Sequence, residues 1–204
     1  MPRVVELDEI LAAFARGVEL ADACRPRATN RRSGTLYQEG IGPHSESSTI
    51  SLAVTAAEHE SLAAAAREVP YADASRNRCD LVIGAGFDSW AIEVKMLRLV
   101  GDNGKPNDNM LMHILSPYPA HRSAVTDCQK LLRSALHGRK AILIFGYDYD
   151  GWAMDPAIRA FELLASADVE LRAAATGSFS GLVHPVHTHG RVFGWEVRSP
   201  SDGD

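Results

Sequence analysis

Residues 78–95 read RCDLVIGAGFDSWAIEVK, and this stretch decides the fold. It contains two short apolar runs, residues 81–83 and 90–94, on either side of a Gly-Ala-Gly break. β-Branched and aromatic runs separated by residues that tolerate positive φ are typical of a β-hairpin. The stretch therefore predicts two antiparallel strands near the middle of the chain.

Alternation along the second strand places Glu93 and Lys95 on one face, and Ile92 and Val94 on the other. Asp80 begins the first strand, so the hairpin can gather two carboxylates and an ammonium group at one place. A divalent-metal site for phosphodiester cleavage requires this set. The alternative is a solvated ion pair that contributes little to stability. The apolar neighbours of Glu93 favour a buried strand, in which a Glu and a Lys need partners or a metal.

The pattern Asp80…Glu93-Val94-Lys95, between two apolar runs and after a helical segment, resembles the PD-(D/E)XK nuclease superfamily. The resemblance covers about residues 45–146, and Cys79 stands where many members have Pro. It implies an α/β fold of the restriction-endonuclease-like kind, with an αβββαβ core, a mixed sheet flanked by helices, and C-terminal strand and helix additions.

The resemblance also implies roles for individual residues. Asp80, Glu93 and the backbone carbonyl of Val94 would hold Mg²⁺ or Mn²⁺, and Lys95 would orient or activate the attacking water. A helix before the first strand often supplies another metal-binding Glu, and Glu60 has a suitable separation from Asp80. The implied activity is hydrolysis of phosphodiester bonds, with DNA as the expected substrate and restriction, defence or repair as possible settings.

Two predicted helices carry the remaining site candidates. The Ala-rich residues 49–69 predict one helix, with Glu58 and Glu60 on either side of its apolar stripe, so Glu58, Glu60 or neither completes the metal site. Residues 123–137 predict a second helix. It carries Gln129, which by resemblance reaches the active site, although Arg133 stands where some members have a Tyr.

The other elements complete a single nuclease-like domain over residues 1–204. We expect an N-terminal helix at 4–24, a central strand at 140–146 and a helix at 156–166. An apolar run at 169–174 and a final strand at 191–197 extend the sheet and its helical cover. Residues 147–204 form a C-terminal extension of the core, and one core strand has no assigned segment.

Composition limits the partners and the compartment. The chain has 204 residues, 46% hydrophobic residues and a formal net charge of −5, which argues against general affinity for nucleic acid but permits a local basic groove. Three scattered cysteines and the absence of a signal or membrane-spanning pattern predict a cytoplasmic protein. The short chain favours a homodimer or a partner subunit.

Three other hypotheses remain open. Asp148-Tyr-Asp150-Gly after a strand is the beginning of a haloacid-dehalogenase-like phosphatase motif, or an acidic turn. His184, His187 and His189 could bind a transition metal, contact nucleic acid or occupy a turn. The whole chain could also be a catalytically inactive nuclease-fold protein that binds nucleic acid or protein.

Overall fold

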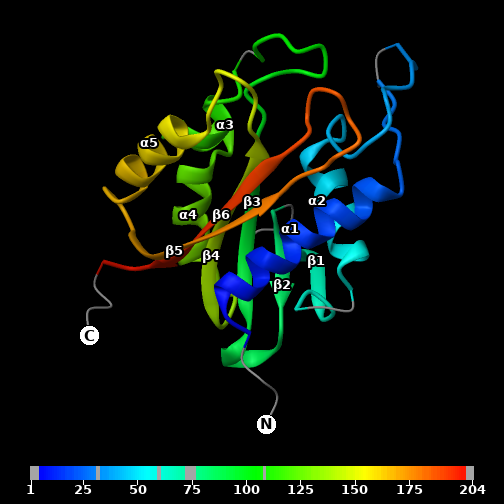
Figure 1. The fold of residues 1–204 in the computed structure, drawn as a ribbon. Coiled ribbons are helices and arrows are strands. Elements are labelled where there is room, and N and C mark those ends of the chain that lie inside the picture. The colour runs from blue at the N-terminus through cyan, green and yellow to red at the C-terminus, as the bar shows by residue number, and fades with distance from the viewer. Residues whose placement is uncertain (1–4, 31–32, 59–60, 72–76, 108, 201–204) are drawn as a thin grey trace.

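The computed structural model describes residues 5–30, 33–58, 61–71, 77–107 and 109–200. It is an α/β structure in which an open, mixed sheet of six strands lies between two layers of helices (Figure 1). The helices are α1 (Leu7–Ala23), α2 (Glu46–Ala56), α3 (Met112–Leu115), α4 (Ala124–Arg133) and α5 (Asp155–Ala165), with short 3₁₀ turns at Gly86–Asp88 and Pro119–His121. The strands are β1 (Ala65–Pro70), β2 (Arg78–Ile83), β3 (Trp90–Leu97), β4 (Arg139–Tyr147), β5 (Glu170–Phe179) and β6 (Gly190–Arg198).

The strand order is β1-β2-β3-β4-β6-β5, so β3 and β4 occupy the centre. β3 and β4 run parallel and are joined through α4, whereas every other neighbouring pair is antiparallel. The predicted hairpin is confirmed as β2 and β3, and the predicted central strand is confirmed as β4. Parallel strands need such a crossover connection, which places α4 against the face of β3 that carries Glu93 and Lys95.

Alternating side chains of the central strands divide the core between the two helical layers. Ile92 and Val94 of β3 pack with α1 and α2, where Phe14 lies against Phe145. Ile142 and Ile144 of β4 pack instead with α3, α4 and α5. Burial on both faces explains why β4 is a continuous apolar run rather than an alternating one.

The expected helix at 49–69 forms only in its first part, and its remainder is wrong. Helix α2 begins earlier, where Ser45 caps it by accepting a hydrogen bond from the Ser48 N–H, and it ends at Ala56. Residues 65–70 form β1 at the edge of the sheet, so this segment supplies the core strand that had no assignment. Helix propensity of the Ala-rich segment is weaker than the gain from pairing with β2.

The remaining expected elements match the structure within a few residues. α1 and α5 are the N-terminal and C-terminal helices, and β5 and β6 complete the sheet beyond β4. None of the helices in the described residues is long and apolar enough to cross a membrane.

The close packing of β4 against β3 and Met154 requires a glycine at position 146. A Cβ there would lie 2.2 Å from the Leu97 carbonyl oxygen and 2.5 Å from Met154 Sδ. We expect Gly146→Ala to lower the free energy of unfolding by about 1–3 kcal/mol, measured by urea denaturation. Gly101→Ala is the control, because its nearest contact would be the flexible Asn103 side chain at 3.3 Å. Equal stability of the two variants would contradict the packing described here.

Candidate metal and phosphodiester site

The site lies where β2 separates from β3. The two strands pair from Ile83 and Trp90 to Leu81 and Ile92, and no farther along β3. The Val94 N–H, which has no strand partner on this side, donates to Asp80 Oδ2 at 2.7 Å. The opening of the sheet thus fixes the Asp80 carboxylate against the backbone of β3.

A second carboxylate accepts a hydrogen bond from the next β3 N–H group on the same side. The Met96 N–H donates to Glu46 Oε2 at 2.7 Å, and Glu46 is the first residue of α2. An acidic residue is favoured in the first turn of a helix by the helix dipole. Glu46 therefore ties α2 to the edge of β3 beside Asp80.

Glu93 is the most buried acid of the site, with 1% of its surface exposed. Its Oε1 accepts a hydrogen bond from the Tyr71 hydroxyl and lies 2.9 Å from Lys130 Nζ. A buried carboxylate without such partners would be strongly destabilising. Tyr71 and Lys130 thus hold one oxygen of Glu93 in place.

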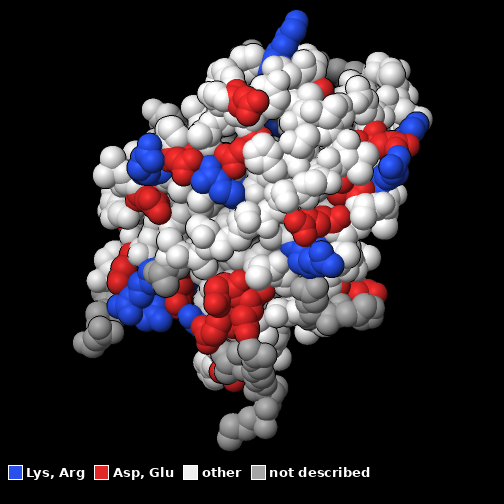
Figure 2. Space-filling model, in the orientation of Figure 1, with Lys and Arg blue, Asp and Glu red and all other residues white. Residues whose placement is uncertain are grey.

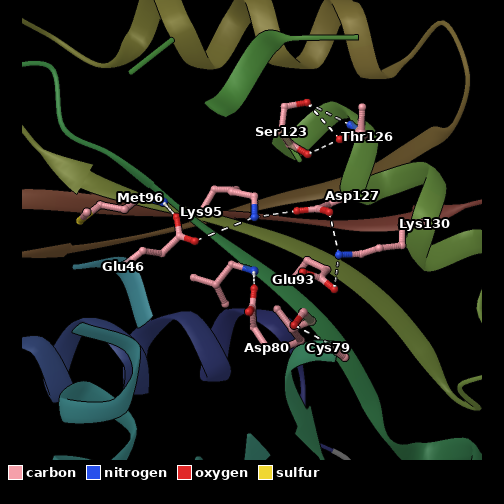
Figure 3. Close-up of polar contacts among 12 residues, drawn as sticks. Glu46, Cys79, Asp80, Glu93, Lys95, Met96, Ser123, Thr126, Asp127 and Lys130 are labelled. Atoms are coloured by element: carbon pink, nitrogen blue, oxygen red, sulfur yellow. Dashed lines mark hydrogen bonds and ion pairs between the residues drawn. The ribbon is translucent and has the colours of Figure 1, made fainter. Parts of the chain in front are cut away.

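Acids and lysines alternate across the site (Figure 3). Lys130 Nζ also lies 2.8 Å from Asp127 Oδ1, whose second oxygen lies 2.7 Å from Lys95 Nζ. Lys95 Nζ in turn lies 3.9 Å from Glu46 Oε1. We call these residues, with Asp80, the acid–lysine cluster: Glu46, Asp80, Glu93, Lys95, Asp127 and Lys130.

All six cluster residues line one cavity of about 400 Å³, here called the central cavity. The rest of its wall consists of Glu68, Asn77, Arg78, His113, His121 and Arg122. When ionised, the four carboxylates and two ammonium groups of the cluster carry a formal excess of two negative charges. With Glu68, Arg78 and Arg122 included, the fully ionised lining of the central cavity carries one net negative charge.

Burial and charge shift the pKa values within the cluster. Burial and the nearby Asp127 and Asp80 carboxylates raise the pKa of Glu93 to about 8. Burial likewise raises the pKa of Glu46. Burial opposes the charge of Lys95, but Asp127 and Glu46 raise its pKa above the ordinary value, so Lys95 is an ammonium ion at neutral pH.

The donor set is compatible with Mg²⁺ or Mn²⁺. Both ions prefer oxygen ligands, and Mg²⁺ is commonly held by one or two carboxylates together with water and phosphate oxygens. Asp80 and Glu93 each use one oxygen for a hydrogen bond within the protein, and within the described chain Asp80 Oδ1 and Glu93 Oε2 accept none. Among the described residues, no three His, Cys, Asp or Glu side chains form a ligand group as they stand, and Lys95 and Lys130 lie between the carboxylates.

The structure brings Asp80, Glu93 and Lys95 to one cavity, as the hairpin pattern predicted. Val94 N–H faces the opening between β2 and β3, and the carbonyl of a strand residue faces the same side as its N–H. This orientation is compatible with the ligand role implied for the Val94 carbonyl.

The helix candidates are placed differently from the expectation. Glu60 lies outside the described residues, and Glu58 follows the end of α2 and is exposed. Glu58 does not lie on the expected helix, because α2 ends at Ala56. Gln129 lies on α4, but its Nε2 donates to Asp168 Oδ2 at 2.8 Å and it does not line the central cavity.

The sequence reasoning missed Glu46, Asp127 and Lys130. A signal for Glu46 was present in Ser45-Glu46-Ser47-Ser48, which is a helix start with a Ser cap. Asp127 and Lys130 are three residues apart on α4 and therefore share a helix face. The sequence pattern does not show that this helix face covers Glu93, because that depends on how the connection from β3 to β4 crosses the sheet.

The other motifs have structural partners. Asp148 makes a two-pronged ion pair with Arg191, at 2.7 and 2.8 Å, as an acidic turn after β4. His184 and His187 are buried and stacked with ring centroids 5.0 Å apart, whereas His189 is exposed. The three histidines do not converge on one point, and His187 Nε2 instead lies 3.0 Å from Asp102 Oδ1.

A scan against models of known protein families, a search of curated proteins and a search of solved structures each found no match.

The raised pKa of Glu93 predicts a pH dependence of stability. The folded protein favours the protonated form of Glu93, so Glu93 makes its full contribution to the free energy of unfolding below pH 4.5, the ordinary pKa of Glu. This contribution is lost as the pH rises to about 8. With a chelator present, we expect the stability of Glu93→Gln, relative to wild type, to increase over this range, measured by urea denaturation at each pH. Asp88→Asn, at the exposed hairpin turn, should follow the wild type. A Glu93→Gln curve parallel to the wild type would contradict the shift.

Proposed function

We propose that this protein is a metal-dependent nuclease that hydrolyses phosphodiester bonds in DNA. The observation that carries the proposal is the convergence of Asp80, Glu93 and Lys95 on the central cavity, where β2 separates from β3. The resemblance of Asp80…Glu93-Val94-Lys95 to the PD-(D/E)XK pattern supports it.

Asp80 and Glu93 would hold Mg²⁺ or Mn²⁺ through Asp80 Oδ1 and Glu93 Oε2, which accept no hydrogen bond from the described residues. When bound, such a cation supplies Lewis acidity at the scissile phosphate and activates a water molecule. Lys95, held as an ammonium ion by Asp127, would orient the water and stabilise the negative charge that develops on the phosphate. Its raised pKa favours this electrostatic role over that of a general base.

Substrate binding must come from local cations rather than from overall charge. On the face drawn in Figure 2, Lys and Arg side chains lie in small groups next to Asp and Glu side chains. Arg78 and Arg122, in contrast, line the central cavity itself and are exposed. Their positions suit contacts with phosphates on either side of the scissile bond.

A second candidate function is a nuclease-fold module that binds nucleic acid or protein without cleavage. It is favoured by the cluster's own ion pairs, since Lys130 and Lys95 already compensate Glu93 and Asp127. Metal binding separates the two candidates.

We expect Mg²⁺ or Mn²⁺ to raise the melting temperature of the wild type, because the ion binds only the folded protein. Asp80→Asn should remove most of this shift, while Asp150→Asn, outside the cluster, should retain it. The measurement is differential scanning fluorimetry across a metal titration. A metal-induced shift that is equal in all three proteins would refute the assigned ligands.

Lys95→Ala tests the chemical step. Cleavage of labelled DNA should fall by a factor on the order of 10²–10³, as for loss of a preorganised donor at a developing charge. The divalent-ion shift in melting temperature should remain. Equal cleavage by both proteins would remove Lys95 from the mechanism, and no cleavage of DNA duplex or single strand by the wild type would favour the binding module.

A further inference from the structure

A second, larger pocket adjoins the central cavity. It has a volume of about 600 Å³ and is called the side pocket here. Both hollows are lined by Asn77, Arg122, Asp127 and Lys130, so they share a wall. A ligand that reaches the cluster from this side must pass over the side pocket.

One face of α4 forms much of the side pocket. The helix contributes Thr126, Gln129, Lys130 and Arg133, which follow the i, i+3, i+4, i+7 spacing of a single face. The same helix therefore supplies Asp127 and Lys130 to the central cavity and a polar wall to the side pocket.

The two hollows differ in charge. The central cavity is lined by five carboxylates and four Lys or Arg side chains, whereas the side pocket is lined by Arg122, Lys130 and Arg133 and, among the described residues, by one acid, Asp127. That acid is already bound to Lys95 and Lys130. Arg122 and Arg133 are exposed and have no acidic partner in the described part of the chain. The side pocket thus favours a negatively charged ligand.

The backbone holds Arg122 at the junction of the two hollows. Arg122 has φ 48° and ψ 49°, a left-handed conformation that is uncommon for a residue other than Gly, directly after the turn Pro119–His121. Strained conformations of this kind tend to occur at functional sites. Its guanidinium can contact a phosphate between the two hollows.

The rest of the lining suits a nucleobase. Pro119 and Ala120 supply apolar surface, Asn77 supplies an amide donor and acceptor, and Gln129, whose Nε2 donates to Asp168 Oδ2, adds a further polar group. Unstacked bases are recognised through their hydrogen-bonding edges and by stacking on guanidinium planes. The volume lies within the range of small-molecule sites, about 300–1,000 Å³, and fits one nucleotide rather than a paired duplex.

We propose that the side pocket binds one unpaired nucleotide next to the scissile phosphate, with Arg122 and Arg133 on its flanking phosphates. The preferred substrate is then a single strand or a strand freed from its duplex. This inference rests on the proposed nuclease function for the position of the scissile phosphate. Its binding step can be tested without cleavage.

The test is fluorescence anisotropy with labelled ten-nucleotide single strands of DNA and RNA and a blunt DNA duplex, with Ca²⁺ in place of Mg²⁺. Arg122→Ala and Arg133→Ala should each weaken single-strand binding about tenfold and reduce the salt dependence, as for loss of one phosphate contact. Arg159→Ala removes the same charge from the exposed side of α5 and is the control, with an expected change below about twofold. Comparing DNA with RNA shows which sugar the pocket accepts.

Absent single-strand binding by the wild type would overturn the inference. The inference would also be overturned if Arg122→Ala and Arg133→Ala bound single strands as tightly as Arg159→Ala. The same holds if both substitutions weakened duplex binding as much as single-strand binding. Cleavage assays with Mg²⁺ keep the two proposals separate. If the wild type shows the expected binding pattern but cleaves nothing, the pocket is supported and the nuclease function is rejected. If the wild type cleaves DNA and the arginine variants bind as well as it does, the nuclease function is supported and the pocket is rejected.

Discussion

A carboxylate buried in the centre of a sheet is the constraint on which this structure depends. Glu93 is 1% exposed, and its carboxyl group requires polar compensation from outside its own strand. Tyr71 and Lys130 provide it, and Lys130 in turn requires Asp127. The ion pairs of the cluster thereby fix α4 against β3 and determine the shape of the central cavity.

The parting of β2 from β3 turns this constraint into a site. Backbone donors that lose a strand partner must be satisfied otherwise, and here Asp80 and Glu46 accept from the Val94 and Met96 N–H groups. Each hydrogen bond orients a carboxylate, and the bond to Asp80 uses Oδ2 and leaves Oδ1 available to a ligand. A metal site at this place would use the same geometry that closes the hydrogen bonding of the sheet.

Local sequence predicted the part of the site that lies on one hairpin. Alternation placed Glu93 and Lys95 on one face, and apolar neighbours indicated burial, because period-2 patterning follows directly from strand geometry. The helix predicted over residues 49–69 was too long because Ala-rich segments have a high helix propensity. Local propensity does not show that part of the segment pairs with β2 as an edge strand. Glu46, Asp127 and Lys130 reach the cavity only through tertiary packing of α2 and α4, which no local pattern encodes.

The most direct measurement is the anomalous diffraction of a crystal soaked in Mn²⁺. The account predicts a peak within coordination distance of Asp80 Oδ1 and Glu93 Oε2, on the side of β3 that β2 leaves open. The same peak should be absent from crystals of Asp80→Asn. A wild-type map without a peak there, at a Mn²⁺ concentration that raises the melting temperature, would contradict the account.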